Sequence, residues 1–155
     1  KWEHFSKWAV KGEALKNKLL AAVDEDTAAY KKIIDAFGLA KNTDEEKQIR
    51  KTAIAEATKY AALVPLSVAE MAFESFDIIE AMVNDGNPNS ITDAAVGALC
   101  ARTAVKGAVM NTQINLVGFE DQAFVDDTLA KALKLDKQAE ERESKIVEKL
   151  KSKLL

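Results

Sequence analysis

Cysteine, histidine, proline and glycine are all scarce in this chain of 155 residues. It has one cysteine, Cys100, one histidine, His4, two prolines and six glycines. A single cysteine excludes a disulfide framework within one chain, and a single histidine far from it excludes the usual Cys/His metal sites. We therefore expect a reducing, cytoplasmic setting, a surface role for His4, and no bound metal.

Long apolar runs and an excess of basic charge are also missing. The uncharged stretches are too short to span a bilayer, and no secretory signal pattern opens the chain. Lys and Arg number 22 against 25 Asp and Glu, a net charge of -3, which does not favour nucleic-acid binding. Strand-like alternation, phosphate-binding loops and nucleophile motifs are absent as well. Neither a membrane nor a nucleic acid is an expected partner.

Helical periodicity dominates what is present, and hydrophobic residues make up 48% of the sequence. Residues 1–155 fit one domain with four long helical segments, separated by turn residues near 38–42, 85–88 and 118–121. Thr43 and Glu46 form a capping-box pattern at the start of the second segment. Pro65 lies inside that segment, where it kinks the helix and frees the carbonyl of Ala61. The predicted fold is an all-α, up-and-down bundle of four long helices.

Asp26 interrupts the apolar seam of the first predicted helix. The seam follows steps of three and four residues through Leu15, Leu19, Ala22, Asp26, Ala29, Ile33 and Ala36. A carboxylate on a core-facing seam needs hydrogen-bond donors, a cation or a proton, because burying it bare costs several kcal/mol. Two interpretations are open: Asp26 sets the register against a neighbouring helix, or it faces a ligand.

The segment from Asn87 to Leu116 is rich in small residues and predicts a helix packed on nearly every side. One stripe of this helix starts with a carboxylate, ends with two carboxamides and has small residues between them: Asp93, Gly97, Cys100, Ala104, Ala108, Asn111 and Asn115. Small residues allow close approach of another backbone, or they leave a groove for a ligand. Tight packing is the simpler of these two explanations.

Five stretches in one order resemble a known family. They are VDEDTAAY at 23–30, LAKNTDEEKQIR at 39–50, VPLSVAE at 64–70, GNPNSITDAAVGA at 86–98 and NTQINL at 111–116. They are similar to the cyclodeaminase half of formiminotransferase-cyclodeaminase, a family that also includes methenyltetrahydrofolate cyclohydrolases. The resemblance extends from about Leu15 to Phe124 and further.

This resemblance implies a folate one-carbon enzyme whose substrate is a tetrahydrofolate derivative and which needs no metal or organic cofactor. The cyclodeaminase converts 5-formiminotetrahydrofolate to 5,10-methenyltetrahydrofolate and ammonia; the alternative is methenyltetrahydrofolate cyclohydrolase. The family's catalytic aspartate falls on Asp26, which burial would equip for proton transfer by raising its pKa. Both reactions present the same carbon to the same acid, so the motifs do not separate them.

The resemblance also implies substrate-binding residues and a homodimer. Asp93, Asn111 and Asn115 match positions of the family's motifs, but the first two are roughly 27 Å apart along a helix and cannot both touch one reacting carbon. Lys106 and Arg102, one turn apart, would attract an anionic glutamate tail, although a solvated face explains them equally well. The small-residue helix adds to the expectation of a homodimer.

One departure from the family leaves non-enzyme alternatives open. Family members carry a further helical segment, opened by a Pro-Gly-Gly-Gly-like stretch, ahead of the region that matches Leu15, and this sequence shows no such stretch. A catalytically silent folate-binding relative or a helical scaffold would keep the same bundle. A ligand-binding relative should gain thermal stability with folate concentration, whereas a scaffold should not.

Overall fold

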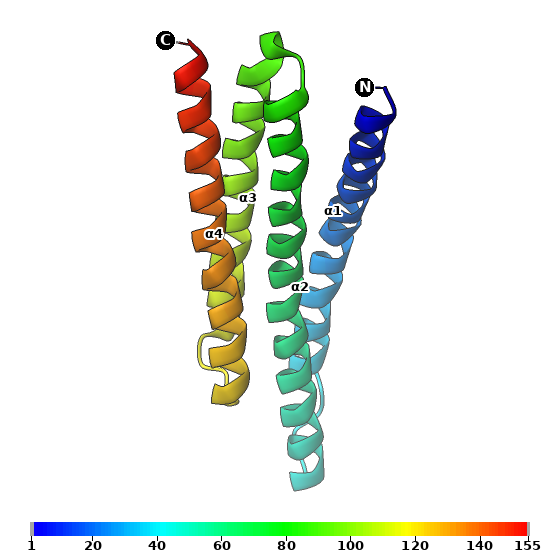
Figure 1. The fold of residues 1–155 in the computed structure, drawn as a ribbon. Helices are drawn as coiled ribbons and strands as arrows, with labels where there is room; N and C mark the ends of the chain where they lie inside the picture. The colour runs from blue at the N-terminus through cyan, green and yellow to red at the C-terminus, as the bar shows by residue number, and fades with distance from the viewer. Residues whose placement is uncertain (1, 155) are drawn as a thin grey trace.

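The computed structural model describes residues 2–154 and contains four long helices joined by short connections (Figure 1). The elements are α1 (Trp2–Phe37), α2 (Asp44–Asp85), the short 3-10 helix η1 (Pro88–Ser90), α3 (Ile91–Leu116) and α4 (Gln122–Leu154). Successive helices run in opposite directions, and both termini lie at the same end of the bundle. This arrangement confirms the predicted up-and-down fold. None of the described helices is long and apolar enough to cross a membrane.

Local sequence signals fix the helix ends. The hydroxyl of Thr43 accepts a hydrogen bond from the backbone N–H of Glu46, and the carboxylate of Glu46 accepts one from the N–H of Thr43, each at 3.1 Å. This confirms the predicted capping box. The Asp121 carboxylate accepts from the Phe124 N–H at 3.1 Å at the start of α4. At α3, the side chain of Ser90 makes no capping bond; η1 provides the turn into that helix instead.

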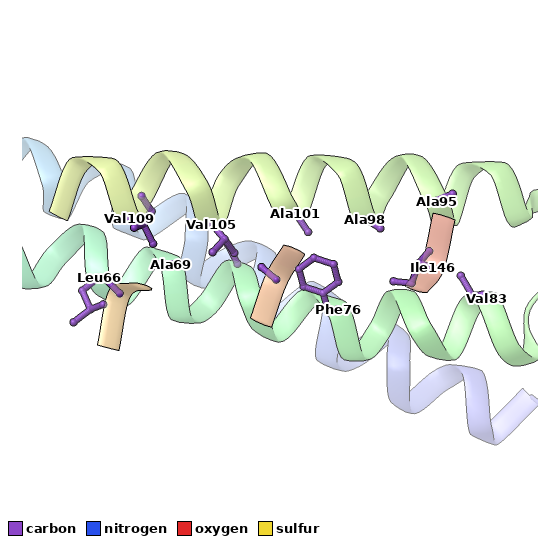
Figure 2. Close-up of a cluster of buried hydrophobic side chains, with 14 of the residues drawn as sticks. Leu66, Ala69, Phe76, Val83, Ala95, Ala98, Ala101, Val105, Val109 and Ile146 are labelled. Atoms are coloured by element: carbon purple, nitrogen blue, oxygen red, sulfur yellow. The ribbon is translucent and has the colours of Figure 1, made fainter. Parts of the chain in front are cut away.

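The main core lies among α2, α3 and α4 and is built largely from alanine (Figure 2). Phe76, Val105 and Val109 are at most 1% exposed and supply its bulk. Around them lie small buried residues that allow close helix packing: Ala69, Ala72, Ala95, Ala98, Ala101, Ala132 and Ala139. Because Phe76 is fully buried in this core, its replacement by alanine would leave a cavity costing about 3–5 kcal/mol.

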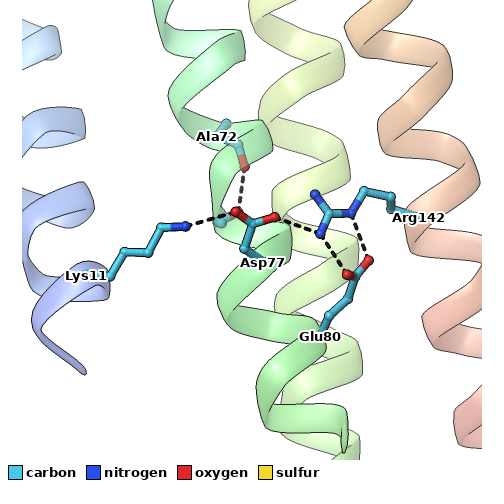
Figure 3. A network of polar contacts seen from close by, with 6 residues as sticks. Lys11, Ala72, Asp77, Glu80 and Arg142 are labelled. Atoms are coloured by element: carbon cyan, nitrogen blue, oxygen red, sulfur yellow. Dashed lines mark hydrogen bonds and ion pairs between the residues drawn. The ribbon is translucent and has the colours of Figure 1, made fainter. Parts of the chain in front are cut away.

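Within residues 2–154, helix α1 packs mainly on α2, and its N-terminal end diverges from the other three helices (Figure 1). A polar network ties this end to the bundle (Figure 3). Asp77 of α2 accepts from Lys11 of α1 at 2.8 Å and from Arg142 of α4 at 2.9 Å, and Arg142 also pairs with Glu80 at 2.7 Å. The hydrogen bond from Lys11 is the main cause that lowers the pKa of Asp77.

Candidate functional site

An open groove runs between α1 and α3, with α2 as its floor. It encloses about 430 Å³. The α1 wall carries Asp26, the α3 wall carries Asn111, and the floor includes Pro65. The remaining lining is apolar or small: Leu19, Ala22, Val23, Thr27, Val68, Ala104, Gly107 and Ala108. An apolar groove with a few converging polar groups is the usual form of a small-molecule site.

A smaller cavity of about 100 Å³ continues from this groove and shares two residues with it, Asp26 and Asn111. Tyr30, Asn115 and Ala61 are among its other lining residues. Three of the predicted site residues, one from α1 and two from α3, therefore meet at one place. The structure also adds Tyr30, which the sequence pattern does not single out as a site residue. Its position four residues after Asp26, and so on the same helix face, was the available signal.

Asp26 is exposed, so the expectation that it faces the core is wrong for this chain. On the seam, Leu15, Ala22 and Ala29 are buried, whereas the alternate positions Leu19 and Ile33 are only partly buried. The reason is that α1 packs mainly on α2 and much less on any other helix, so only half of its seam is covered. Asp26 belongs to the uncovered half and faces the groove, which leaves it accessible to a ligand.

Asn115 has a backbone partner on α2. Its side-chain amide donates to the carbonyl oxygen of Ala61 at 2.8 Å. This carbonyl is the one that Pro65, four residues later, leaves without its helical donor. Helix α2 continues unbroken through the buried Pro65. The hydrogen bond that the Ala61 carbonyl lacks within α2 is therefore replaced by one from α3.

Asp93 and Lys106 lie away from the Asp26 end of the groove. Asp93 is exposed in the first turn of α3, where the helix dipole favours a carboxylate. Lys106 faces α4, and its ammonium group contacts the Asp136 carboxylate at 2.6 Å. Arg102 contacts the same carboxylate at 2.5 Å. Burial alone would raise the pKa of Asp136, but these two hydrogen bonds outweigh it and lower that pKa.

Helix α3 is not packed on every side, which corrects the prediction for this segment. Its buried face carries Ala98, Val105 and Val109, but Val96 is 58%, Met110 59% and Ile114 64% exposed. Cys100 is also exposed. The apolar character all round this helix therefore reflects two faces with different roles. One face forms the core, and the other is open beside the groove.

Two further observations limit where a site can be. A larger cavity of about 550 Å³ lies against the α3–α4 connection, but none of the predicted site residues lines it. Its lysines form ion pairs, with Lys51 3.0 Å from Glu120 and Lys59 3.8 Å from Asp121.

Within residues 2–154, no three His, Cys, Asp or Glu side chains are grouped so that they could hold a metal ion.

Comparison with known proteins identifies the family. The sequence pattern of formiminotransferase-cyclodeaminase matches residues 1–134. This chain belongs to that family. A methenyltetrahydrofolate cyclohydrolase from Methylorubrum extorquens is 36% identical over 144 residues, which cover 93% of this chain and 69% of the relative. Mouse formimidoyltransferase-cyclodeaminase is 33% identical over 111 residues, or 72% of this chain, and the match spans only 20% of the mouse protein.

The fold agrees with this assignment. A crystal structure of formiminotetrahydrofolate cyclodeaminase from Thermotoga maritima superposes with a TM-score of 0.78. It is 22% identical in sequence, and the match covers 92% of this chain and 67% of the other. The family resemblance found in the motifs is thus confirmed, and the relatives are enzymes of folate one-carbon chemistry.

Proposed function

We propose that this chain forms the folate site of an enzyme that acts on the one-carbon bridge of 5,10-methenyltetrahydrofolate. The observation that carries the proposal is that Asp26 and Asn111 line one groove in a chain of this family. Apolar walls suit a flat ring system, and a carboxylate with a carboxamide can hydrogen bond its polar edge. No metal or organic cofactor is proposed, so a chelator should leave turnover unchanged.

Asp26 is proposed to transfer protons at the nitrogens that flank the reacting carbon. Ring closure of 5-formiminotetrahydrofolate requires N10 to lose a proton and the departing amine to gain one. Hydrolysis of the methenyl bridge requires the attacking water to lose both protons: one is released to solvent, and one goes to a bridge nitrogen as its bond to carbon breaks and the formyl group forms. One carboxylate can act as base and then as acid in either sequence.

Methenyltetrahydrofolate cyclohydrolase is the reaction that we place first. The Methylorubrum enzyme of that name is 36% identical over 93% of this chain, whereas the pig formimidoyltransferase-cyclodeaminase is 29% identical over 88%. Formimidoyltetrahydrofolate cyclodeaminase is the second candidate, supported by the likeness to the mouse protein. Histidine degradation would be the setting of that second reaction only.

We also propose a homodimer in which a second copy covers the groove. A stripe of α1 side chains at steps of three, four or seven residues, each more than half exposed, comprises Leu20, Val23, Tyr30, Ile34 and Phe37. The exposed face of α3 lies across the groove from it. Exposed apolar side chains grouped along a helix in this way are typical of an interface. A partner placed there would also exclude bulk water from the groove, which strengthens the electrostatic interactions of Asp26 with a bound folate. The single cysteine supports a proposed cytoplasmic location.

The test is to offer both substrates to the purified protein and to follow methenyl hydrolysis and ammonia release separately. We expect hydrolysis to be the faster reaction. Faster ammonia release from 5-formiminotetrahydrofolate would exchange the order of the two candidates. If neither reaction exceeds the buffer rate and folates do not raise the melting temperature, the chain is a scaffold and the proposed function fails. A rise in melting temperature without turnover would identify a silent folate-binding relative.

A further inference from the structure

Asn115 makes a contact that a substrate-binding residue has no need to make. Its amide donates to the Ala61 carbonyl at 2.8 Å, and this oxygen is the single acceptor in α2 that Pro65 deprives of its i+4 donor. A carbonyl left unpaired in a partly buried position is costly, so a donor from another helix stabilises the proline-containing turn. Pro65 and Ala61 are both buried.

The contact lies beside the groove residues. Asn111 precedes Asn115 by one helical turn on the same face of α3, and both line the small cavity together with Asp26 and Ala61. A bond that fixes α3 against α2 at Asn115 therefore also fixes Asn111 relative to α2, the helix on which α1 and its Asp26 pack. Loss of the bond would allow α3 to shift at the point where the carboxamide and the carboxylate share a ligand.

We infer that Asn115 is a positioning residue: its side-chain amide replaces the backbone donor that Pro65 removes and thereby sets the placement of Asn111 opposite Asp26. This inference rests on the proposed function for its catalytic consequence, but its structural part does not. It also differs from the role that the family resemblance implies, in which Asn115 contacts the substrate. Both roles predict that replacing Asn115 harms the enzyme, so a single substitution does not separate them.

A second substitution separates them, because the need for Asn115 depends on residue 65 being proline. Pro65→Ala gives α2 its own N–H for the Ala61 carbonyl. If Asn115 acts through that carbonyl, Asn115→Leu should be harmful in the native background and nearly harmless in the Pro65→Ala background. If Asn115 touches substrate, Pro65→Ala cannot replace it, since the lost contact is with the ligand.

The experiment is a double-mutant cycle on the full chain, with melting temperature, KM and kcat measured for the native protein, Asn115→Leu, Pro65→Ala and the double variant. In the native background we expect Asn115→Leu to lower the melting temperature by about 3–10 °C, the range for one unpaired carbonyl. We also expect turnover to fall about tenfold to hundredfold through misplacement of the site. Relative to Pro65→Ala alone, the double variant should lose less than about 2 °C and less than about threefold in kcat/KM.

Asn111→Leu is the matched control. It removes a carboxamide from the same cavity, but Ala61 accepts its bond from Asn115 and not from Asn111. Pro65→Ala should therefore not restore the activity of Asn111→Leu. If Asn115→Leu alone fails to fold while the double variant folds, the inference is supported without kinetics.

Two outcomes would overturn the inference. Equal losses of melting temperature in both backgrounds would show that the Asn115 contact does not compensate for the proline. If the Pro65→Ala background restores the melting temperature of Asn115→Leu but not its KM or kcat, Asn115 contacts the substrate. A native protein that lacks folate activity would count against the proposed function, while the melting temperatures would still report on the Asn115 contact.

Discussion

Asp26 of α1 and Asn111 of α3 line the same two cavities, although they lie far apart in the sequence. They meet because α1 and α3 both pack on α2 and leave its intervening face as the floor of a groove. The carboxylate can exchange a proton, and the carboxamide can both donate and accept a hydrogen bond. This complementarity makes the pair the centre of the proposed site.

Asn111→Ala should weaken substrate binding more than it slows chemistry. The carboxamide is placed to hold the polar edge of a ligand, and loss of one neutral hydrogen bond costs about 0.5–1.5 kcal/mol. We expect KM to rise several-fold, with kcat changed less, in steady-state kinetics with the proposed folate substrates. Thr103→Ala, an exposed position on the same helix outside the groove lining, is the control. An unchanged KM for Asn111→Ala would remove this residue from the site.

Lys106→Gln should leave KM for the folate substrate nearly unchanged. The ammonium group faces α4 and contacts Asp136 at 2.6 Å, while the groove lining on α3 is formed by other residues. The expected effect is a small loss of stability, because Lys106 is half exposed and Arg102 still pairs with Asp136. A KM that rises tenfold, and more for substrates with longer glutamate tails, would show that Lys106 binds the tail after all.

Asp136 should contribute to acid sensitivity. Its pKa is lowered in the folded state because hydrogen bonds from Lys106 and Arg102 outweigh the effect of burial. A lowered pKa stabilises the fold above the unfolded value of about 3.9, and the contribution is lost as pH falls through the folded pKa. Asp136→Asn should therefore reduce stability at pH 7 and flatten its decline below about pH 4. Urea unfolding from pH 7 to pH 2.5 measures both effects, and an unchanged acid slope would contradict this assignment.

The sequence predicted the four helices well because their signals are local. Thr43 with Glu46, Gly38 after the first helix and the turn at Asp85–Pro88 each act within a few residues, and the structure places helix ends there. Pro65 was also informative, since it identified Ala61 as the carbonyl that needs a donor. That Asn115 supplies the donor could not be predicted, because the contact joins two helices.

Burial was predicted less well, for a related reason. Periodicity shows that α1 has an apolar seam and that α3 is apolar on most sides, but not how many helices cover each face. The sequence places Asp26 on this seam, yet the residue is exposed because α1 packs mainly on one helix, α2. Likewise, Met110 and Ile114 have core-like chemistry but lie on an open face.

That open face provides a test of the proposed dimer. Met110 and Ile114 are 59% and 64% exposed, and a charge at either position would be buried if a second copy packed there. Met110→Glu with Ile114→Glu should give a folded monomer by light scattering, with a large loss of activity if the partner shields the groove. Leu133→Glu, at a 47% exposed position on α4, should leave the dimer intact. A native protein that is monomeric across micromolar concentrations would refute the dimer.

The strongest prediction concerns Asp26→Asn. The side chain is exposed, and the amide has nearly the shape of the carboxylate, so the melting temperature should stay within about 1–2 °C of the native value. An amide cannot exchange a proton at neutral pH, and general acid–base groups contribute about a hundredfold to ten-thousandfold to turnover. Both kcat and kcat/KM should therefore fall by at least about a hundredfold, with little change in folate affinity.

Asp24→Asn is the matched control for this prediction. Asp24 is exposed on α1 two residues before Asp26, but it lines neither the groove nor the small cavity. The two variants lose the same charge on the same helix, so a general electrostatic effect would slow both equally. A role in proton transfer slows only Asp26→Asn, because only that carboxylate reaches the groove. A folded Asp26→Asn protein with a near-native rate would exclude Asp26 as the catalytic residue, whatever the fate of the folate assignment.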